Sequence, residues 1–469
     1  MGEKAAAAAR KGRLRLFRFC VYGLVLATSG TQFAVVPVLP TYAHTFGLSG
    51  VQQGAVLGAT GLAALAVSMP AGALSDRYGA RKLTLWAGVL MTAGVFAQAL
   101  ATSFPLLLGS RLVFGIGYAV VWTAGLAWLA DAAPGGPGLG GSVASAGAGG
   151  VAGPAYAGIM VQYVGLATTY LIVAAILGAL TAVLVLLRMP AAPPVPSARM
   201  GSRLRAATSD RGTIGAAAAI VVAGGTTGVS ALLVPALLHE AGLPPGRIGL
   251  VFAVAGGLFV LGSTLTATVG GRAVRLAVIT AAMAALGLAF TPAIVSTTAL
   301  ALVVMLCATT IARSVLWTVS YPLAALGAER SGAGVGVVLG LLNGVWAVTV
   351  LLSPLVAGFV AGFASAQAVF GLTAAACAVV LAATVVTVRP RGGVLRRPGP
   401  PVTSSMPGAA GKATGRNHRG DQANGRRCCG RWGEPLRGAE GKSWPRPTRG
   451  AGADQASSVP PPGPIASCA

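Results

Sequence analysis

Long apolar segments recur along roughly the first 390 residues, separated by short stretches that are polar or rich in Gly and Pro. A helix needs about 20 residues to cross the hydrocarbon core of a bilayer. The apolar runs are continuous rather than alternating, which favours helices over the strands of a membrane barrel. The predicted membrane spans are 17–40, 51–70, 83–102, 105–128, 141–164, 167–187, 214–237, 248–268, 274–293, 297–322, 333–359 and 365–388.

The amino-acid composition excludes an ordinary soluble protein. Of the 469 residues, 55% are hydrophobic and only 9% are charged, whereas a soluble domain carries about 25% charged residues. So few charged side chains cannot cover a surface that faces water, but a surface that faces lipid does not need them. We therefore predict an all-α membrane protein with twelve transmembrane helices.

The predicted spans carry no residue pattern of an enzyme or a metal site. The histidines His44, His239 and His418 fall in predicted loops or near the C-terminus. No span combines a nucleophile with a base, and the six cysteines lack the spacing of metal ligands. We expect no enzymatic activity, no metal and no cofactor.

One polar interruption divides the spans into two sets of six. The segment 188–213 is rich in Pro, Ser and Arg, which is typical of a linker. The expected organisation is a basic cytoplasmic N-terminus (1–16), a six-helix bundle (17–187), a cytoplasmic linker (188–213), a second six-helix bundle (214–388) and a basic, disordered cytoplasmic tail (389–469).

The two sets of spans resemble each other in sequence. At an offset of about 200 residues, Pro154 and Gly158 match Pro354 and Gly358, and GLSGVQQG at 47–54 resembles GLPPGRIG at 242–249. Weak symmetry between two halves is typical of transporters built from repeats, in which the substrate site lies near the middle of the membrane. We therefore expect two pseudo-symmetric bundles.

The chain carries 34 Lys and Arg residues against 10 Asp and Glu, and most of the cations fall in alternate loops. Loops on the cytoplasmic side of a membrane protein are enriched in Lys and Arg. This pattern predicts that both termini are cytoplasmic. Because the cations lie in short loops, we do not expect the main body to bind nucleic acid, the other common partner of a basic chain.

The loop between the second and third spans reads GALSDRYGARK over 72–82. Its glycines permit a tight turn, and its basic residues favour the cytoplasmic side. The pattern resembles the G-x-L-x-D-R-x-G-R-[RK] motif of the major facilitator superfamily, with Ala80 at a position that is often Arg. The resemblance implies the major facilitator fold and a cytoplasmic latch used in alternating access. Its expected residues are Gly72, Leu74, Asp76, Arg77, Gly79, Arg81 and Lys82, with Asp131 as the acidic partner.

The fourth span contains LLGSRLVFGIG at 107–117, which is similar to a second motif of that superfamily. A charge within a span is costly and usually faces a cavity or a partner. Arg111 and Arg313 lie in spans four and ten, and no acid is expected at mid-membrane. The candidate residues for the substrate cavity or for coupling are Gln32, Arg111, Tyr118, Trp122, Arg313, Trp317, Tyr321, Asn343 and Trp346.

The fifth span carries a spaced set of small residues. They let helices pack closely, and a proline bends the span. The set resembles the antiporter motif of proton-driven drug exporters, with Ala157 departing from it. Its members are Gly140, Gly149, Gly153, Pro154 and Gly158.

We therefore expect a multi-pass protein of the bacterial plasma membrane that exports small hydrophobic or amphipathic compounds by alternating access, in exchange for protons. Its expected partners are a small-molecule substrate, protons and the lipid bilayer, and we expect a monomer. No acidic residue falls at mid-membrane as an obvious proton carrier. The alternatives are an organic-anion or metabolite carrier with an arginine-lined cavity, and a membrane receptor or sensor that transports nothing.

Overall fold

The computed structural model of the chain describes residues 2–132, 138–187, 189, 200–333 and 335–388. These residues form helices and no strands. The expected tail (389–469) and most of the expected linker lie outside the described residues.

The first half of the chain forms α1 (Gly2–Phe46), α2 (Gly50–Tyr78), α3 (Ala80–Ala99), α4 (Phe104–Val120), the short π-helix η1 (Val121–Gly125), α5 (Leu126–Ala132) and α6 (Gly138–Leu187). The second half forms α7 (Met200–Ala207), α8 (Arg211–Glu240), α9 (Pro245–Val269), the 3-10 turn η2 (Gly270–Arg272), α10 (Leu276–Leu288), α11 (Thr291–Val295), α12 (Ala299–Ser331), α13 (Val335–Val360) and α14 (Ala366–Val388).

The described helices are consistent with twelve membrane crossings. Ten described segments are long and apolar enough to span a bilayer, and Gly141–Leu187 of α6 is one of them. Because the backbone of Gly165 leaves the helical region (φ 78°, ψ 171°), α6 consists of two arms and supplies two crossings. α3, with 20 residues, supplies the remaining one. The two arms correspond to the predicted spans 141–164 and 167–187.

Two helical regions extend beyond the predicted elements. α1 has 45 residues and continues through most of the expected basic N-terminus, because a run of alanines there has the highest helix propensity. α7 and the start of α8 fall within the expected linker. The α8 start is stabilised by Asp210, whose side chain accepts a hydrogen bond from the Thr213 amide at 2.8 Å.

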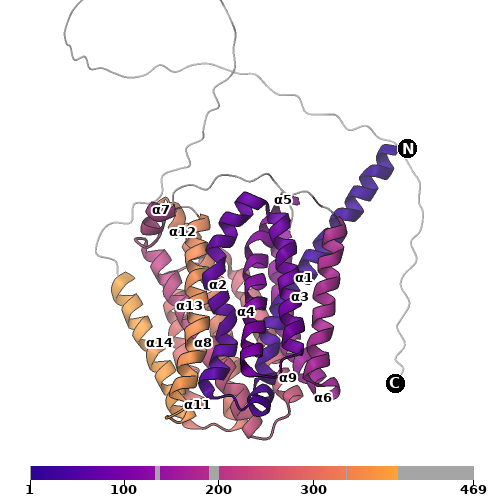
Figure 1. Cartoon of the computed structure of the whole chain (residues 1–469). Helices are drawn as coiled ribbons and strands as arrows, with labels where there is room; N and C mark the ends of the chain where they lie inside the picture. Colours follow the sequence, from indigo (N-terminus) through magenta and orange to yellow (C-terminus); the bar gives the residue numbers. More distant parts are fainter. Residues whose placement is uncertain (1, 133–137, 188, 190–199, 334, 389–469) are drawn as a thin grey trace, which may run out of the picture. The chain divides into compact units, whose positions relative to one another are not determined.

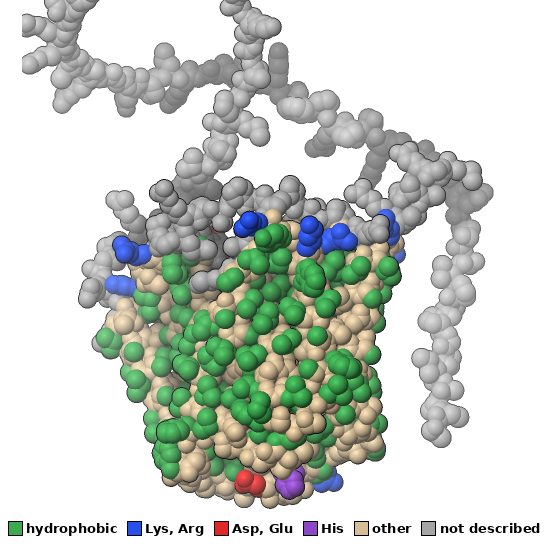
Figure 2. All heavy atoms as spheres, in the orientation of Figure 1, with side chains coloured by type: hydrophobic (Ala, Val, Ile, Leu, Met, Phe, Trp, Pro, Cys, Tyr) green, Lys and Arg blue, Asp and Glu red, His purple; other side chains and the backbone are tan. Residues whose placement is uncertain are grey.

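The described helices pack side by side into one bundle (Figure 1). The two ends of this bundle differ in charge. Blue Lys and Arg side chains gather at one end in Figure 2. Arg77 and Lys82 lie at this end, where α2 joins α3, and Arg272 and Arg275 lie where α9 joins α10. All four side chains are exposed. We call it the basic end. The opposite end holds the loops that join α1 to α2 and α8 to α9.

The bundle interior is mostly apolar. Many of its short polar side chains make hydrogen bonds within their own helix. Phe17 packs edge-on against Trp128 with ring centroids 4.7 Å apart, and both are fully buried. Many buried hydroxyls bond to carbonyls one turn back in their own helix, as Thr84 does to Ala80 at 2.8 Å, whereas Ser230 Oγ has no partner among the described residues. Since no water hydrates the hydrocarbon layer, this pairing suits a transmembrane helix.

Candidate functional site

A buried arginine lies inside the first half of the bundle. Arg111 of α4 is 0% exposed. Its Nη2 donates to Gln32 Oε1 of α1 at 3.0 Å and lies 3.2 Å from Thr60 Oγ1 of α2. Its guanidinium carbon also lies 5.3 Å from the centroid of the Phe114 ring. The structure thus brings together Arg111 and Gln32, two residues that the sequence singled out.

The remaining nitrogens of Arg111 have no hydrogen-bond partner. Nε and Nη1 are both buried and unpaired, and so are the hydroxyls of Tyr42 and Tyr170. The three groups interact electrostatically, with the Gln98 amide beside the two tyrosines. Tyr42, Gln98 and Tyr170 come from α1, α3 and α6, and sequence reasoning missed them. In the sequence, these three residues stood out only as polar groups in or next to an apolar span.

The second half holds its own buried arginine. Arg313 of α12 donates from Nη1 to Thr227 Oγ1 of α8 at 2.9 Å and from Nη2 to Thr310 Oγ1 at 2.7 Å. Among the described side chains, no acid pairs with Arg313 or with Arg111, and the ion pair present joins Arg330 to Asp210. Each half therefore carries an intramembrane cation held by neutral groups.

Aromatic side chains lie in the first half at the C-terminal end of α4 and in η1. The rings of Tyr118 and Trp122 have centroids 6.3 Å apart, and both are half-buried. Trp122 lies in the π-helix η1. Single π-turns inside α-helices are frequent at functional sites, and no residue pattern predicted this one.

A matching aromatic cluster lies in the second half. The Trp317 ring of α12 meets the Trp346 ring of α13 edge-on at 4.8 Å, and its centroid lies 5.3 Å from that of Tyr321. The Tyr321 hydroxyl bonds to Asn343 Oδ1 at 3.2 Å. Tyr321 also interacts electrostatically with Tyr118 of the first half. The two clusters thus come near each other through Tyr118 and Tyr321, and we call them together the aromatic wall.

The two halves approach most closely near the opposite end, through α2 and α13. A Cβ at Gly54 would lie 2.9 Å from the Leu355 amide nitrogen, and one at Gly50 would lie 2.6 Å from the Gly358 carbonyl oxygen. Real Cβ atoms do not approach other atoms so closely. Glycine is therefore required at both positions for these two backbones to touch.

α6 and α9 make the equivalent contact. A Cβ at Gly249 would lie 3.2 Å from the Gly158 Cα and 3.2 Å from the Pro154 carbonyl carbon. A Cβ at Gly158 would lie 3.0 Å from the Gly249 Cα and 3.1 Å from the Pro245 carbonyl carbon. We call the α2–α13 and α6–α9 contacts together the glycine seal.

The glycine seal is built from the residues that form the sequence repeat. Gly54 lies against Pro354 as Gly249 lies against Pro154, and the contact of Gly50 with Gly358 corresponds to that of Pro245 with Gly158. In the antiporter-type set on α6, Gly158 and Pro154 serve this seal. Gly149 and Gly153 instead pack against Gly30 of α1 within the first half. The surroundings of Gly140 lie outside what the structure describes.

The loop expected to form the cytoplasmic latch is a single residue long. α2 ends at Tyr78 and α3 begins at Ala80, and Gly79 between them has a φ of 90°, a region that favours glycine. The Arg77 guanidinium carbon lies 5.4 Å from the centroid of the Tyr78 ring.

Several other residues of the expected latch lie at the basic end. Leu74 and Lys82 are exposed, and Arg81 is half-buried. The side chains of Gly72, Asp76 and Asp131 lie outside those that the structure describes. The pairing of the latch with Asp131 stays a prediction.

An ion pair at the basic end was not foreseen as a functional feature. Arg330 at the end of α12 donates from Nε and Nη2 to the two carboxylate oxygens of Asp210, at 3.0 and 3.1 Å. Partial burial raises the pKa of Asp210, but the hydrogen bonds from Arg330 and Thr213 outweigh it, so the pKa lies below its ordinary value. The pair fixes the start of α8 against α12.

We expect Asp210→Asn to lower the unfolding free energy by about 1 kcal/mol, because asparagine still caps α8 but cannot pair as an anion. Asp210→Ala, which also removes the cap, should cost about 2 kcal/mol. A lowered native pKa stabilises the fold above the unfolded value of about 3.9 and loses this effect as pH falls through the native pKa. Thermal unfolding in detergent should therefore separate wild type from Asp210→Asn at pH 7, and the difference should shrink as the pH falls below about 3.9 toward the lowered native pKa of Asp210. A difference that does not shrink over this range would contradict this assignment.

Comparison with known proteins agrees with this architecture. The profile of the Major Facilitator Superfamily matches residues 21–338. A stretch of 159 residues is 31% identical to the multi-drug resistance efflux pump PmrA homolog of Lactococcus lactis, covering 32% of this chain and 39% of that protein. A stretch of 101 residues is 32% identical to the quinolone resistance protein NorA of Staphylococcus aureus, covering 21% of this chain and 26% of that one. The matched stretches thus span well under half of these relatives.

Solved structures share the fold at low sequence identity. A bacterial homolog of the human lysosomal transporter Spinster, in an inward-facing and unoccupied conformation, superposes with a TM-score of 0.61 at 17% identity, covering 81% of this chain and 94% of that one. The POT family transporter PepTSo superposes with a TM-score of 0.66 at 11% identity, covering 80% and 97%. The profile match extends over more than half of the chain. The chain belongs to the major facilitator superfamily.

Proposed function

We propose that this chain is a secondary transporter that exports small hydrophobic or amphipathic compounds by alternating access. The observation that carries the proposal is the glycine seal, which brings the two halves into backbone contact near the opposite end of the bundle. Among the described residues, an apolar groove lies between α6 and α9 on the side of the basic end. This arrangement is the one expected of a transporter caught with access from a single side.

We assign the basic end to the cytoplasm because loops on that side are enriched in Lys and Arg. The open side then faces the cytoplasm, from which an exporter must take its substrate. The similarity to efflux pumps supports the same direction of transport. The plasma membrane of a bacterial cell is the corresponding location.

The aromatic wall supports the proposed substrate class. Stacked Trp and Tyr rings bind apolar and cationic groups by area burial and by attraction between cation and ring. Asn343 and the Tyr321 hydroxyl add polar contacts that can orient an amphipathic compound. Transport of a lipophilic cationic dye in everted membrane vesicles is the direct test, and absence of energy-dependent dye accumulation would count against export.

We expect Trp317→Ala and Trp346→Ala each to raise the dye concentration for half-maximal transport about tenfold, because loss of one aromatic contact costs about 1–2 kcal/mol. Trp86→Ala is the matched control, since Trp86 is 68% exposed on the surface of α3. Dye uptake at graded concentrations measures the effect. If the dye concentration for half-maximal transport shifts equally in all three variants, the aromatic wall is not part of the binding site.

A second candidate is an organic-anion carrier, which Arg111 and Arg313 favour because both are intramembrane cations without an acidic partner among the described side chains. Exchange for protons is a further part of the first proposal. Measuring substrate-dependent proton flux in proteoliposomes, once with a cationic and once with an anionic substrate, distinguishes the proton-coupled exporter from the anion carrier. If anion transport is unchanged in Arg111→Ala, the second candidate loses its support.

A further inference from the structure

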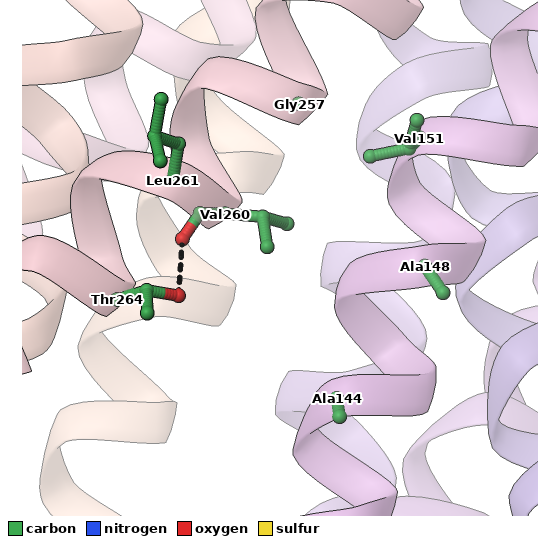
Figure 3. Close-up of a pocket in the computed structure, with 7 residues that line it drawn as sticks. All are labelled: Ala144, Ala148, Val151, Gly257, Val260, Leu261 and Thr264. Carbon is green, nitrogen blue, oxygen red and sulfur yellow. Dashed lines mark hydrogen bonds between the residues drawn. The ribbon is translucent and has the colours of Figure 1, made fainter. Parts of the chain in front are cut away.

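An apolar groove of about 520 Å³ runs between α6 and α9 on the side of the bundle. Ala144, Ala148 and Val151 of α6 line one side, and the other side is formed by α9. Figure 3 shows these α6 side chains facing Val260 across open space. Exposure of Ala144, Ala148 and Val260 indicates that the groove opens outward from the bundle.

α6 and α9 stay in contact beside the groove. A Cβ at Gly256 would lie 3.3 Å from the Gly150 carbonyl oxygen, and one at Gly147 would lie 3.3 Å from Val260 Cγ2. At Gly257, which lines the groove, a Cβ would meet nothing within 4 Å. The groove therefore runs alongside the α6–α9 contact.

The lining of the groove accepts only apolar groups. Thr264 carries its one hydroxyl, and this hydroxyl already donates to the Val260 carbonyl at 2.8 Å (Figure 3). The seven helical steps from Gly257 to Thr264 rise by about 10 Å, compared with about 15 Å for one leaflet of the hydrocarbon core. The groove thus matches most of the depth of one leaflet.

A cation lies where the groove reaches the membrane surface. Along α9 the lining residues Gly257, Leu261 and Thr264 recur at helical spacing, and α9 ends five residues later at Val269, directly before the turn η2 that carries Arg272. Arg272 and the nearby Arg275 are both exposed. An occupant of the groove would therefore have its polar end beside two positive charges.

We propose that this groove binds one acyl chain of an anionic phospholipid from the leaflet at the basic end, with the phosphate group beside Arg272 and Arg275. The apolar lining selects the chain, and the two arginines select the negative headgroup. A lipid in this position separates α6 from α9 and so stabilises the state that is open at the basic end.

Native mass spectrometry of the full chain in detergent tests the proposal with dioleoyl phosphatidylglycerol, dioleoyl phosphatidylcholine and free glycerol phosphate. We expect phosphatidylglycerol to be retained about tenfold more than phosphatidylcholine, and glycerol phosphate not to be retained. Ala148→Phe and, as a second variant, Ala144→Phe should each reduce retention of both lipids about tenfold by filling the groove. Arg272→Gln with Arg275→Gln should keep the chain bound but remove the preference for phosphatidylglycerol.

Two controls make the outcome specific. Val254→Phe adds the same ring to α9 at an exposed position outside the groove lining, and Arg247→Gln removes a cation from the opposite end. Both should retain lipid like wild type. Unchanged retention in both phenylalanine groove variants, or equal retention of the two lipids by wild type, would overturn the proposal. Because the experiment measures lipid retention, its result does not depend on whether the proposed transport function is correct.

Discussion

Replacing Gly54 or Gly249 with leucine should reduce transport about 100-fold while leaving the folded protein intact. Each glycine places backbone against backbone across the two halves, and a Cβ there would lie within about 3 Å of its neighbours. Overpacking of this kind costs about 1–3 kcal/mol. Because the cost falls only on the state closed at that end, it shifts the balance between states, and about 2.8 kcal/mol corresponds to a factor of 100.

A membrane-impermeant maleimide can measure this shift. In a background without native cysteines, Asn343→Cys places a thiol beside the aromatic wall. We expect Gly54→Leu to increase its labelling from the side of the opposite end. Gly109→Leu is the matched control, because a Cβ at Gly109 meets nothing within 4 Å. The glycine seal would lose its assigned role if Gly54→Leu and Gly109→Leu transported equally well.

Arg111→Met should likewise lower the transport rate about 100-fold, but without loss of stability. The methionine fills a similar volume and removes a buried charge that lacks an acidic partner among the described side chains. Replacing buried charges with apolar groups is often neutral or stabilising by about 1–4 kcal/mol. Against this, Gln32 and Thr60 lose a hydrogen-bond partner, at a cost of about 1–3 kcal/mol.

Thermal unfolding and dye transport in the same preparations separate the two roles of Arg111. We expect an unfolding temperature close to that of wild type and a transport rate lowered about 100-fold. Arg111→Lys, which keeps the charge but cannot reach Gln32 and Thr60 in the same geometry, should be nearly as inactive. Full transport by the methionine variant would show that Arg111 is only a structural residue.

Hydrophobic patterning was sufficient to predict the helices, because a span in lipid must be both long and apolar. It placed two spans in α6 on either side of residues 165–166, although the break itself depends on the dihedral angles of Gly165. Helix ends were less predictable. α1 extends to Gly2 because alanine propensity continues the helix past the apolar segment.

The repeat between residues 154–158 and 354–358 predicted that the two halves are symmetric, but it did not predict which residues these segments contact. Only the structure shows that these residues meet 50–54 and 245–249 in two equivalent contacts. The same holds for the neighbours of Arg111, because Tyr42, Gln98 and Tyr170 are brought together by packing of three helices. Side-chain environment within a bundle depends on helix rotation, and weakly amphipathic spans leave that rotation unspecified in the sequence.

Distances between spin labels at the two ends of the bundle test alternating access most directly. One pair, Thr45 and Phe363, is exposed at the opposite end, and the other, Lys82 and Glu329, is exposed at the basic end. On addition of a transported dye and a proton gradient, we expect the first distance to lengthen in a fraction of molecules and the second to shorten in the same fraction. Distances that stay constant at both ends while the dye is transported would contradict the account.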